Sequence, residues 1–381
     1  MSDFSRREFV KLGAASAAEL LLRWDRSGNA LAVAAAATQE ESVSTTLRQA
    51  AASRGVIYGA AVRGSSLEDE RFERLLAEQC GILVPEGALK WHTLRPAPDR
   101  FDFRAGDQLL EYARTHNMKY RGHTLVWHEA LPAWFEAHAT VSNARTLMTT
   151  HIQTVVKHYA GKLHSWDVVN EIIEPNDGRP DGLKKSPWLS AIGPEYIDLA
   201  FQAAADADPK ALLVWNENLL EGESDYSQAK RRHVLTLLTE LKRRGTPVQA
   251  LGLQGHLYGH LPVARGLRDF VARVADFGLK ILVTELDVRD QRLPGDVATR
   301  DRMVAEKYLE FLSAVVPEKA LIAVLSWGLS DRYTWLNDPG LPLGQRRRDG
   351  MPARPLPFDA DLRRKPAFVA IQRAFDSSPA R

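Results

Sequence analysis

Residues 280–288 read KILVTELDV, a run of apolar and β-branched side chains that leads to a carboxylate at Glu285. A short, almost uninterrupted apolar run is typical of a strand that is buried on both faces of a sheet. A helical pattern precedes this run at 263–277, and another follows it at 299–316. Strands that alternate with helices in this way build parallel α/β folds. The stretch therefore predicts an inner parallel strand whose carboxyl end carries an acidic side chain.

The same strand–helix unit recurs from about Leu47 onward. The expected strands span 56–61, 82–84, 119–126, 165–170, 212–215, 251–254, 280–284 and 321–327. Helical patterns span 69–79, 106–116, 143–159, 194–206, 227–244, 263–277, 299–316 and 365–375. Eight units in series predict an α/β fold, a single (β/α)8 TIM barrel. A doubly wound open sheet is the alternative, but the residues around the first strand do not fit the GxGxxG phosphate-binding pattern.

The composition is that of an ordinary globular protein. Of the 381 residues, 45% are hydrophobic and 26% are charged, and the formal net charge is +2. This balance gives no support for a nucleic acid or an anionic membrane as a partner. Cys80 is the single cysteine, so no intramolecular disulfide can form, and its apolar neighbours predict a buried side chain. We expect neither a cofactor nor a metal, and the sequence makes no prediction of the oligomeric state.

The N-terminal segment, residues 1–37, is interpreted as an export signal. Residues 5–11 read SRREFVK, which resembles a twin-arginine signal, and an Ala-rich apolar stretch follows. This apolar stretch is too short to span a membrane, because charged residues such as Glu19 and Arg23 interrupt it. We therefore expect a mature catalytic domain at 38–381 that is periplasmic or secreted.

Polar and aromatic side chains gather at the carboxyl ends of the expected strands. Barrel enzymes carry their catalytic residues at these ends. The residues in question are Glu86, Lys90, Trp91, His123, Trp127, His128, Asn170, Glu171, Trp215, Asn216, Glu217, Gln254, His256, Glu285, Asp287, Trp327 and Trp335. If the barrel closes, these side chains converge on one pocket.

Two glutamates in this set suit one reaction. Glu171 closes the segment WDVVNE and Glu285 follows ILVT, and their strands stand across the barrel mouth from each other. Hydrolysis of a glycosidic bond needs one carboxylic acid to protonate the leaving oxygen and one carboxylate at the anomeric carbon. The pair therefore predicts a glycoside hydrolase.

Several segments resemble glycoside hydrolase family 10, whose members are mostly retaining endo-β-1,4-xylanases. They are GHTLVWH at 122–128, WDVVNE at 166–171, LGLQGH at 251–256, TELDV at 284–288, WGLSDRYTW at 327–335, PFD at 357–359 and KPAF at 365–368. The resemblance runs from about Val56 to Phe368 with the motifs in order. It implies a (β/α)8 barrel that cleaves β-1,4-xylosidic bonds in xylan by double displacement.

The resemblance also implies a role for each site residue. Glu171 would be the acid/base, and Glu285 the nucleophile. His256 would hold Glu285 in place, and Asp287 would orient His256. The remaining contacts would come from Asn170 at the sugar 2-hydroxyl, Gln254 at the leaving-group side, Glu86, Lys90, His123 and Trp127 at the non-reducing side, and Trp327 and Trp335 over the ring at the cleavage point.

Three positions depart from the family pattern. Gly87 stands where the family usually has Asn, Ala130 where it has Gln, and Asn218 where it has Tyr. The first two positions would contact the more distal non-reducing sugar, and the third the leaving-group side. We therefore expect altered outer contacts around an intact catalytic pair.

Three alternatives remain open at this stage. The same mechanism could act on another β-1,4-glycan or on a short oligosaccharide. A non-catalytic sugar-binding barrel would more often have lost one catalytic carboxylate. A metal-dependent hydrolase could use His123, His128 and His256 together with Glu285, although their spacing resembles no common ligand motif.

Overall fold

The structure, a computed structural model, describes residues 45–379, and the expected export signal at 1–37 lies outside them. The folded unit begins at Leu47. Its strands are β1 (Ile57–Val62), β2 (Ile82–Pro85), β3 (Lys119–Gly122), β4 (Ser165–Asn170), β5 (Leu212–Glu217), β6 (Ala250–Leu253), β7 (His256–Tyr258), β8 (Lys280–Arg289) and β9 (Leu321–Ser326). The order is β6-β5-β4-β3-β2-β1-β9-β8, and a parallel pairing of β6 with β8 closes the ring. The predicted single (β/α)8 barrel is confirmed.

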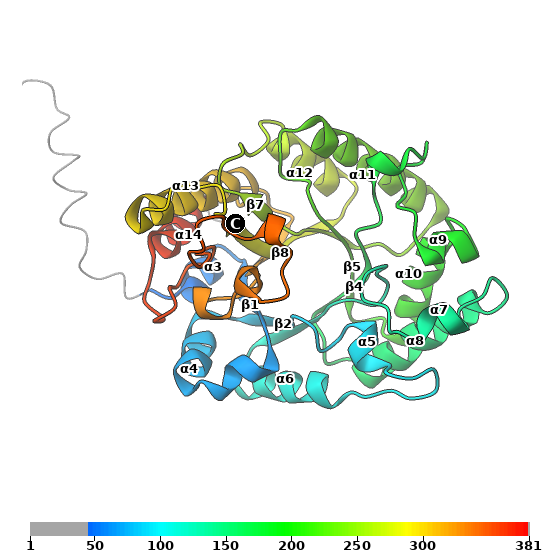
Figure 1. Ribbon diagram of the computed structural model, residues 1–381. Helices are drawn as coiled ribbons and strands as arrows, with labels where there is room; N and C mark the ends of the chain where they lie inside the picture. Colours follow the sequence, from blue (N-terminus) through cyan, green and yellow to red (C-terminus); the bar gives the residue numbers. More distant parts are fainter. Residues whose placement is uncertain (1–44, 380–381) are drawn as a thin grey trace, which may run out of the picture. The chain divides into compact units, whose positions relative to one another are not determined.

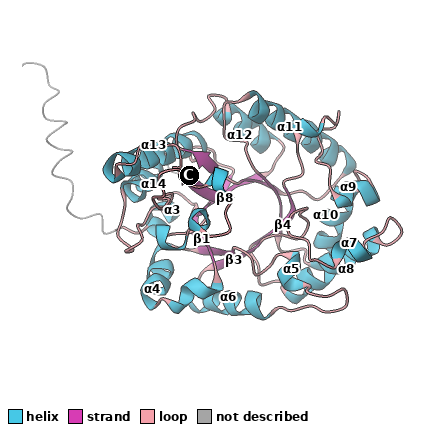
Figure 2. Cartoon of the chain, in the orientation of Figure 1, coloured by secondary structure: helices cyan, strands magenta, loops and turns pink. Residues whose placement is uncertain are grey.

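Helices form a ring around the barrel (Figures 1 and 2). The longer helices are α4 (Glu70–Gln79), α6 (Arg104–Thr115), α8 (Ala144–His158), α10 (Tyr196–Ala207), α11 (Asp225–Arg244), α12 (Leu267–Asp276), α13 (Val297–Val315) and α14 (Pro366–Asp376). The shorter ones are α3 (Leu47–Ala52), α5 (Trp91–Leu94), α7 (Phe135–His138) and α9 (Pro187–Ile192). Short 3-10 turns are η1 (Gly64–Glu68), η2 (Pro175–Asp177), η3 (Asp331–Tyr333), η4 (Trp335–Asn337) and η5 (Leu343–Gln345). No helix between residues 45 and 379 is long and apolar enough to cross a membrane.

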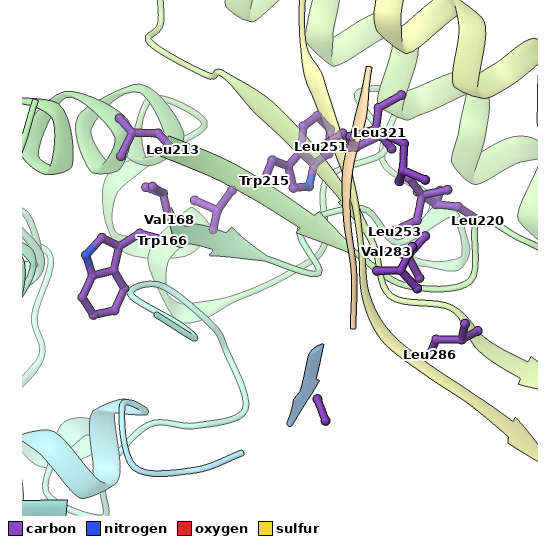
Figure 3. Close-up of a cluster of buried hydrophobic side chains, with 14 of the residues drawn as sticks. Trp166, Val168, Leu213, Trp215, Leu220, Leu251, Leu253, Val283, Leu286 and Leu321 are labelled. Atoms are coloured by element: carbon purple, nitrogen blue, oxygen red, sulfur yellow. The ribbon is translucent and has the colours of Figure 1, made fainter. Parts of the chain in front are cut away.

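Alternate side chains of each strand pack on opposite faces of the barrel wall. In β2, Ile82 and Val84 belong to the cluster inside the barrel, whereas Leu83 packs in the larger cluster between strands and helices. This division follows from the period of two in a strand. Figure 3 shows part of the outer cluster, where Trp166, Leu213 and Trp215 are among the labelled side chains. Cys80 is fully buried in the same cluster.

The two strands that carry the glutamates break this alternation. In β8 the pairing with β9 shifts register between Val283 and Leu286. Val283 and Leu286 both pack in the outer cluster, so Thr284 and Glu285 between them face inward. β-Bulges are common next to active sites because they redirect a side chain.

A similar irregularity interrupts β4. Its pairing with β5 shifts between Asp167 and Val169, and the neighbours Val168 and Val169 both pack in the outer cluster. Asn170 then faces the inside of the barrel mouth. Each of the two glutamate-bearing segments is therefore placed by a local departure from regular strand geometry.

The predicted third strand, 119–126, and the predicted seventh strand, 280–284, differ most from the structure, because β3 is shorter and β8 continues to Arg289. The third was predicted to run to Val126, but β3 ends at Gly122. The chain rejoins β4 through backbone hydrogen bonds from Leu125 and Val126. Strand β6 ends at Leu253, and the chain turns at Gly255, which has a φ of +80°, before it continues as the separate strand β7. Gly255 therefore turns the chain so that His256 and Tyr258 pair with Asp287 and Arg289 of β8.

Candidate functional site

The carboxyl ends of the strands surround a cleft of about 740 Å³. It brings together all but one of the side chains to which the family resemblance gives a role. The cleft is lined by Glu86, Lys90, His123, Trp127, Asn170, Glu171, Gln254, His256, Glu285, Trp327 and Trp335. The exception is Asp287, which lies fully buried against His256. Five other strand-end residues that we expected at the pocket do not line it, namely Trp91, His128, Trp215, Asn216 and Glu217. Side chains that the sequence did not point to also line the cleft, among them Arg63, Tyr258, Arg289 and Asp338.

Glu285 is held as an anion at the base of the cleft. Its Oε1 accepts a hydrogen bond of 2.7 Å from Nδ2 of Asn216, and its Oε2 lies 3.2 Å from Nε2 of His256. Burial alone would raise the pKa of Glu285, but the hydrogen bond from His256 and the charges of His123, His256 and Lys90 lower it to about 2. The side chain is therefore ionised at neutral pH.

His256 has a carboxylate at each ring nitrogen. Its Nδ1 lies 2.9 Å from Oδ1 of Asp287, and Oδ2 of Asp287 accepts a hydrogen bond of 2.8 Å from Nε1 of Trp335. Burial disfavours the charged ring, but Asp287 and Glu285 together raise the pKa of His256 to about 10. The imidazolium thus stabilises the anion on Glu285, and the indole of Trp335 is oriented through the same network.

Glu171 occupies a different electrostatic environment. It follows β4 directly and has a φ of +55°, a backbone conformation that is uncommon outside glycine and recurs at functional sites. Its Oε1 accepts a hydrogen bond of 2.8 Å from Nε2 of Gln254, and its Oε2 accepts one of 3.1 Å from Nε1 of Trp127. Its hydrogen-bond donors are therefore neutral, in contrast to the imidazolium beside Glu285.

Asn170 and Asn216 connect the two glutamates. Nδ2 of Asn216 donates to Oδ1 of Asn170 at 2.8 Å as well as to Glu285. Nδ2 of Asn170 is buried and has no partner among the described residues. A buried amide group normally has a partner. The free N–H groups of Asn170 at the cleft are therefore available to a ligand hydroxyl.

One half of the cleft carries an ion-pair cluster. Arg63 donates to both carboxylate oxygens of Glu86, at 2.7 and 2.6 Å, and to both of Asp338, at 2.8 and 2.6 Å. Glu86 follows β2, whereas Asp338 belongs to the long segment after β9. Arg63 therefore joins two walls of the cleft that are far apart in the sequence.

Lys90 and His123 line the same cleft as the ion-pair cluster of Arg63. The ammonium of Lys90 lies 4.8 Å from the ring centre of Trp127 and 6.0 Å from that of Trp327. Burial lowers the pKa of Lys90, and the neighbouring carboxylates oppose this effect. Nδ1 of His123 lies 2.9 Å from Asp167, a buried carboxylate that also binds Arg121. These contacts fix the ring of His123 in the wall of the cleft.

Comparison with known proteins identifies the family of this chain. Residues 46–374 match the family model Glycosyl hydrolase family 10. The chain belongs to this family. It is 36% identical over 286 residues to the Beta-1,4-xylanase of Dictyoglomus thermophilum, which covers 73% of this chain and 78% of that protein. Native xylanase 10B from Thermotoga maritima superposes with a TM-score of 0.78 at 32% identity, over 87% of this chain and 98% of that chain.

One relative that is similar at the same level is named for a different activity. Exoglucanase XynX of Acetivibrio thermocellus is 35% identical over 329 residues, which are 82% of this chain. The chain spans 28% of the length of that protein.

The three departures from the family pattern fall in different surroundings. Gly87 and Asn218 line the cleft, and a Cβ atom at Gly87 would have no atom within 4 Å. Ala130 is buried, and its carbonyl accepts a hydrogen bond from the backbone of His92. The side chain of Asn218 is bound by Lys230. The cleft is therefore open beside Gly87, and Asn218 is engaged within the protein.

Two polar residues at the end of β5 do not line the cleft. Asn216 is buried between the glutamate-bearing strands. Glu217 is also fully buried, forms an ion pair of 2.8 Å with Lys230, and accepts hydrogen bonds from the backbone N–H groups of Ile172 and Ile173. Glu217 therefore fixes the turn that follows Glu171. Polarity at a strand end could not distinguish this role from a place in the cleft.

The four side chains that the metal-dependent alternative requires do not form a group of possible metal ligands among the described residues. Among the described residues, the group whose ligand atoms lie within 4.8 Å of one another is His128, Glu129 and Glu171. It shares only His128 with the set that the alternative requires. Both nitrogens of His256 already face carboxylates, and His123 faces Asp167. The four proposed ligands are thus not gathered around one point.

Proposed function

We propose that this protein is a retaining endo-β-1,4-xylanase in which Glu171 is the acid/base and Glu285 the nucleophile. Membership of glycosyl hydrolase family 10, in which retention is general, supports the reaction. The names of the relatives, such as the Beta-1,4-xylanase of Dictyoglomus thermophilum, support the substrate. The observation that carries the proposal is that the two glutamates line one cleft, where Glu285 contacts the imidazolium of His256 and Glu171 accepts hydrogen bonds from the neutral donors of Gln254 and Trp127.

The first step forms a covalent intermediate. Glu285 attacks the anomeric carbon through a carboxylate oxygen, while Glu171 donates its proton to the glycosidic oxygen as the carbon–oxygen bond breaks. The imidazolium of His256 keeps Glu285 anionic before the attack. Glu171 is positioned for the proton transfer by hydrogen bonds from Nε2 of Gln254 and Nε1 of Trp127. The leaving sugar then departs as a neutral alcohol.

The second step releases the bound sugar. Glu171 is now ionised and takes a proton from water, whose oxygen attacks the same anomeric carbon and frees Glu285. Two inversions restore the original β configuration. The free amide of Asn170 is suited to bind the sugar 2-hydroxyl, a contact that strengthens in the transition state.

A product analysis tests this proposal. Xylan, mixed-linkage glucan and cellulose should be incubated with the protein and with Glu285→Gln as the inactive control. We expect xylan to be cleaved fastest, with a rapid loss of viscosity and products of several lengths, and with the β-anomer formed first by NMR. Release of one short product from glucan or cellulose without loss of viscosity would instead favour an exoglucanase.

We also propose that the protein is exported through a twin-arginine pathway and begins near Thr38 in its mature form. The SRREFVK segment at 5–11 and the Ala-rich stretch behind it support this proposal. The test is N-terminal sequencing of protein recovered outside the cytoplasm, with Arg6→Lys/Arg7→Lys as the matched variant. An intact Met1 on exported protein, or unchanged export of the variant, would contradict it.

A further inference from the structure

Arg289 lines the cleft, and its guanidinium is close to the aromatic rings of Trp335 and Tyr258. It is the last residue of β8, the strand that carries Glu285, and it pairs in register with Tyr258 of β7. Its guanidinium carbon lies 4.8 Å from the ring centre of Trp335 and 5.3 Å from that of Tyr258. Stacking against aromatic faces holds a guanidinium in a fixed orientation. Arg289 thus presents a positioned cation at the wall of the cleft.

Within the described part of the chain, the guanidinium of Arg289 has no anionic partner. None of the ion pairs formed by residues 45–379 includes Arg289, and the single described hydrogen bond of its side chain is a long one, 3.5 Å from Nη1 to the hydroxyl of Tyr258. Nε of Arg289 is buried and has no hydrogen-bond partner among the described residues. Arg63, the other arginine of the cleft, binds two carboxylates. A buried donor without a partner is rare in a folded protein, and it indicates an acceptor that arrives with a ligand.

Arg289 lies in the half of the cleft that would hold the leaving sugar. Gln254 of the β6–β7 segment binds Glu171, the proposed proton donor, so the leaving sugar lies on this side. Tyr258, which contacts Arg289, follows Gln254 in the same segment. Beyond Tyr258 the cleft continues into an adjoining pocket of about 410 Å³ that shares Leu219, His256 and Tyr258 with it. A group attached to the leaving sugar therefore has space to reach Arg289.

The chemistry of the guanidinium selects the ligand. Its planar fork matches the two oxygens of a carboxylate, and it binds this group better than it binds a neutral hydroxyl. Xylose itself carries no charge, so the acceptor must come from a substituent. We propose that Arg289 binds the carboxylate of a uronic acid branch on the leaving-group side of the scissile bond and makes the enzyme selective for acidic xylan. This inference rests on the proposed xylanase function.

The experiment compares two polymers that differ only in charge. Glucuronoxylan is one substrate, and the other is the same glucuronoxylan after chemical reduction of its carboxylates to alcohols. The value of kcat/KM is measured on both for the wild type, for Arg289→Gln and for Arg289→Lys. The matched control is Arg292→Gln, which removes the same charge from an exposed position outside the cleft. Binding of acidic and neutral xylo-oligosaccharides to Glu285→Gln, with and without Arg289→Gln, gives a readout that does not depend on turnover.

We expect the wild type to prefer the acidic polymer and Arg289→Gln to lose about tenfold or more on that polymer alone. Arg289→Lys should retain part of the preference, and Arg292→Gln should retain all of it. Equal losses on both polymers would overturn the proposal, because Arg289 would then only support Trp335 and Tyr258. Unchanged activity on both would overturn it as well. If the wild type cleaves neither polymer, the proposed xylanase function fails instead.

Discussion

Nε2 of His256 lies 3.2 Å from Oε2 of Glu285, while Nδ1 of the same ring lies 2.9 Å from Asp287. Because a carboxylate faces each nitrogen, both nitrogens act as donors and the ring is an imidazolium. Its charge holds the pKa of Glu285 well below the usual value, against the effect of burial. The contact therefore keeps the proposed nucleophile ready to attack.

Replacement of the nucleophile should abolish turnover. Glu285→Gln keeps the shape of the side chain but removes the anion that forms the covalent bond, so we expect kcat on xylan to fall by at least about 10⁴-fold. Reducing-sugar release measures the loss. Glu240→Gln, at a partly exposed position of α11 where Glu240 forms an ion pair with Arg243, is the matched control and should keep full activity. Residual activity of Glu285→Gln above one hundredth of the wild type would exclude the role assigned to Glu285.

Replacement of the acid/base should affect substrates according to their leaving groups. Glu171→Ala removes the proton donor, so kcat on xylan should fall by about 10²- to 10⁴-fold. An aryl xylobioside with a dinitrophenolate leaving group needs no proton, and its first step should stay within about tenfold of the wild type. A stopped-flow burst of dinitrophenolate measures that step directly. If the burst slows as much as the reaction on xylan, Glu171 does not act as the acid.

The barrel and the position of Glu171 and Glu285 at the cleft could be predicted because both depend on local patterns. Apolar runs of strand length alternate with helical patterns, and a polar residue at the end of each strand is visible without knowledge of contacts. Local patterns do not show whether a side chain points into the barrel or toward the helices. Strict alternation from Val283 would turn Glu285 toward the helices, and only the register shift in β8 brings it into the cleft.

Contacts between distant segments could not be predicted either. Arg63 and Asp338 are 275 positions apart, and nothing in their local sequence distinguishes them from other surface charges. In the sequence, Glu217 follows an apolar run as Glu171 and Glu285 do, yet in the structure it is buried beneath the turn after Glu171. Which carboxylates face the ligand and which bind the backbone depends on the closed barrel.

The buried pair of Lys230 and Glu217 should support both stability and activity. Lys230→Met would leave Glu217 as an uncompensated charge in the interior, at a cost of about 3–5 kcal/mol in the free energy of unfolding. Because Glu217 binds the backbone of Ile172 and Ile173, kcat should fall as well. Urea denaturation measures the first effect. Lys242→Met, near the end of the same helix, is the control, and an equal loss of stability in that variant would contradict the assignment.

The charged state of His256 should make stability depend on pH in a defined direction. Its pKa is raised in the folded protein from 6.5 to about 10, because Asp287 and Glu285 outweigh the effect of burial. Below pH 6.5 the ring is charged in both the folded and the unfolded state, and the stabilisation is complete. As the pH rises above 6.5 the unfolded chain loses this proton while the folded protein keeps it, so the stabilisation declines until the folded pKa is reached.

The measurement compares urea denaturation of the wild type with that of His256→Gln at pH 6.5 and pH 9.5. We expect the stability advantage of the wild type to shrink by more than about 1 kcal/mol between these values, since one pKa unit corresponds to about 1.4 kcal/mol. His260, whose pKa is lowered by burial and by Arg292, is the control. The difference between the wild type and His260→Gln should stay constant over this range. An equally constant difference for His256→Gln would show that the ring is neutral in the folded protein, and it would remove the imidazolium from the explanation of the anionic Glu285.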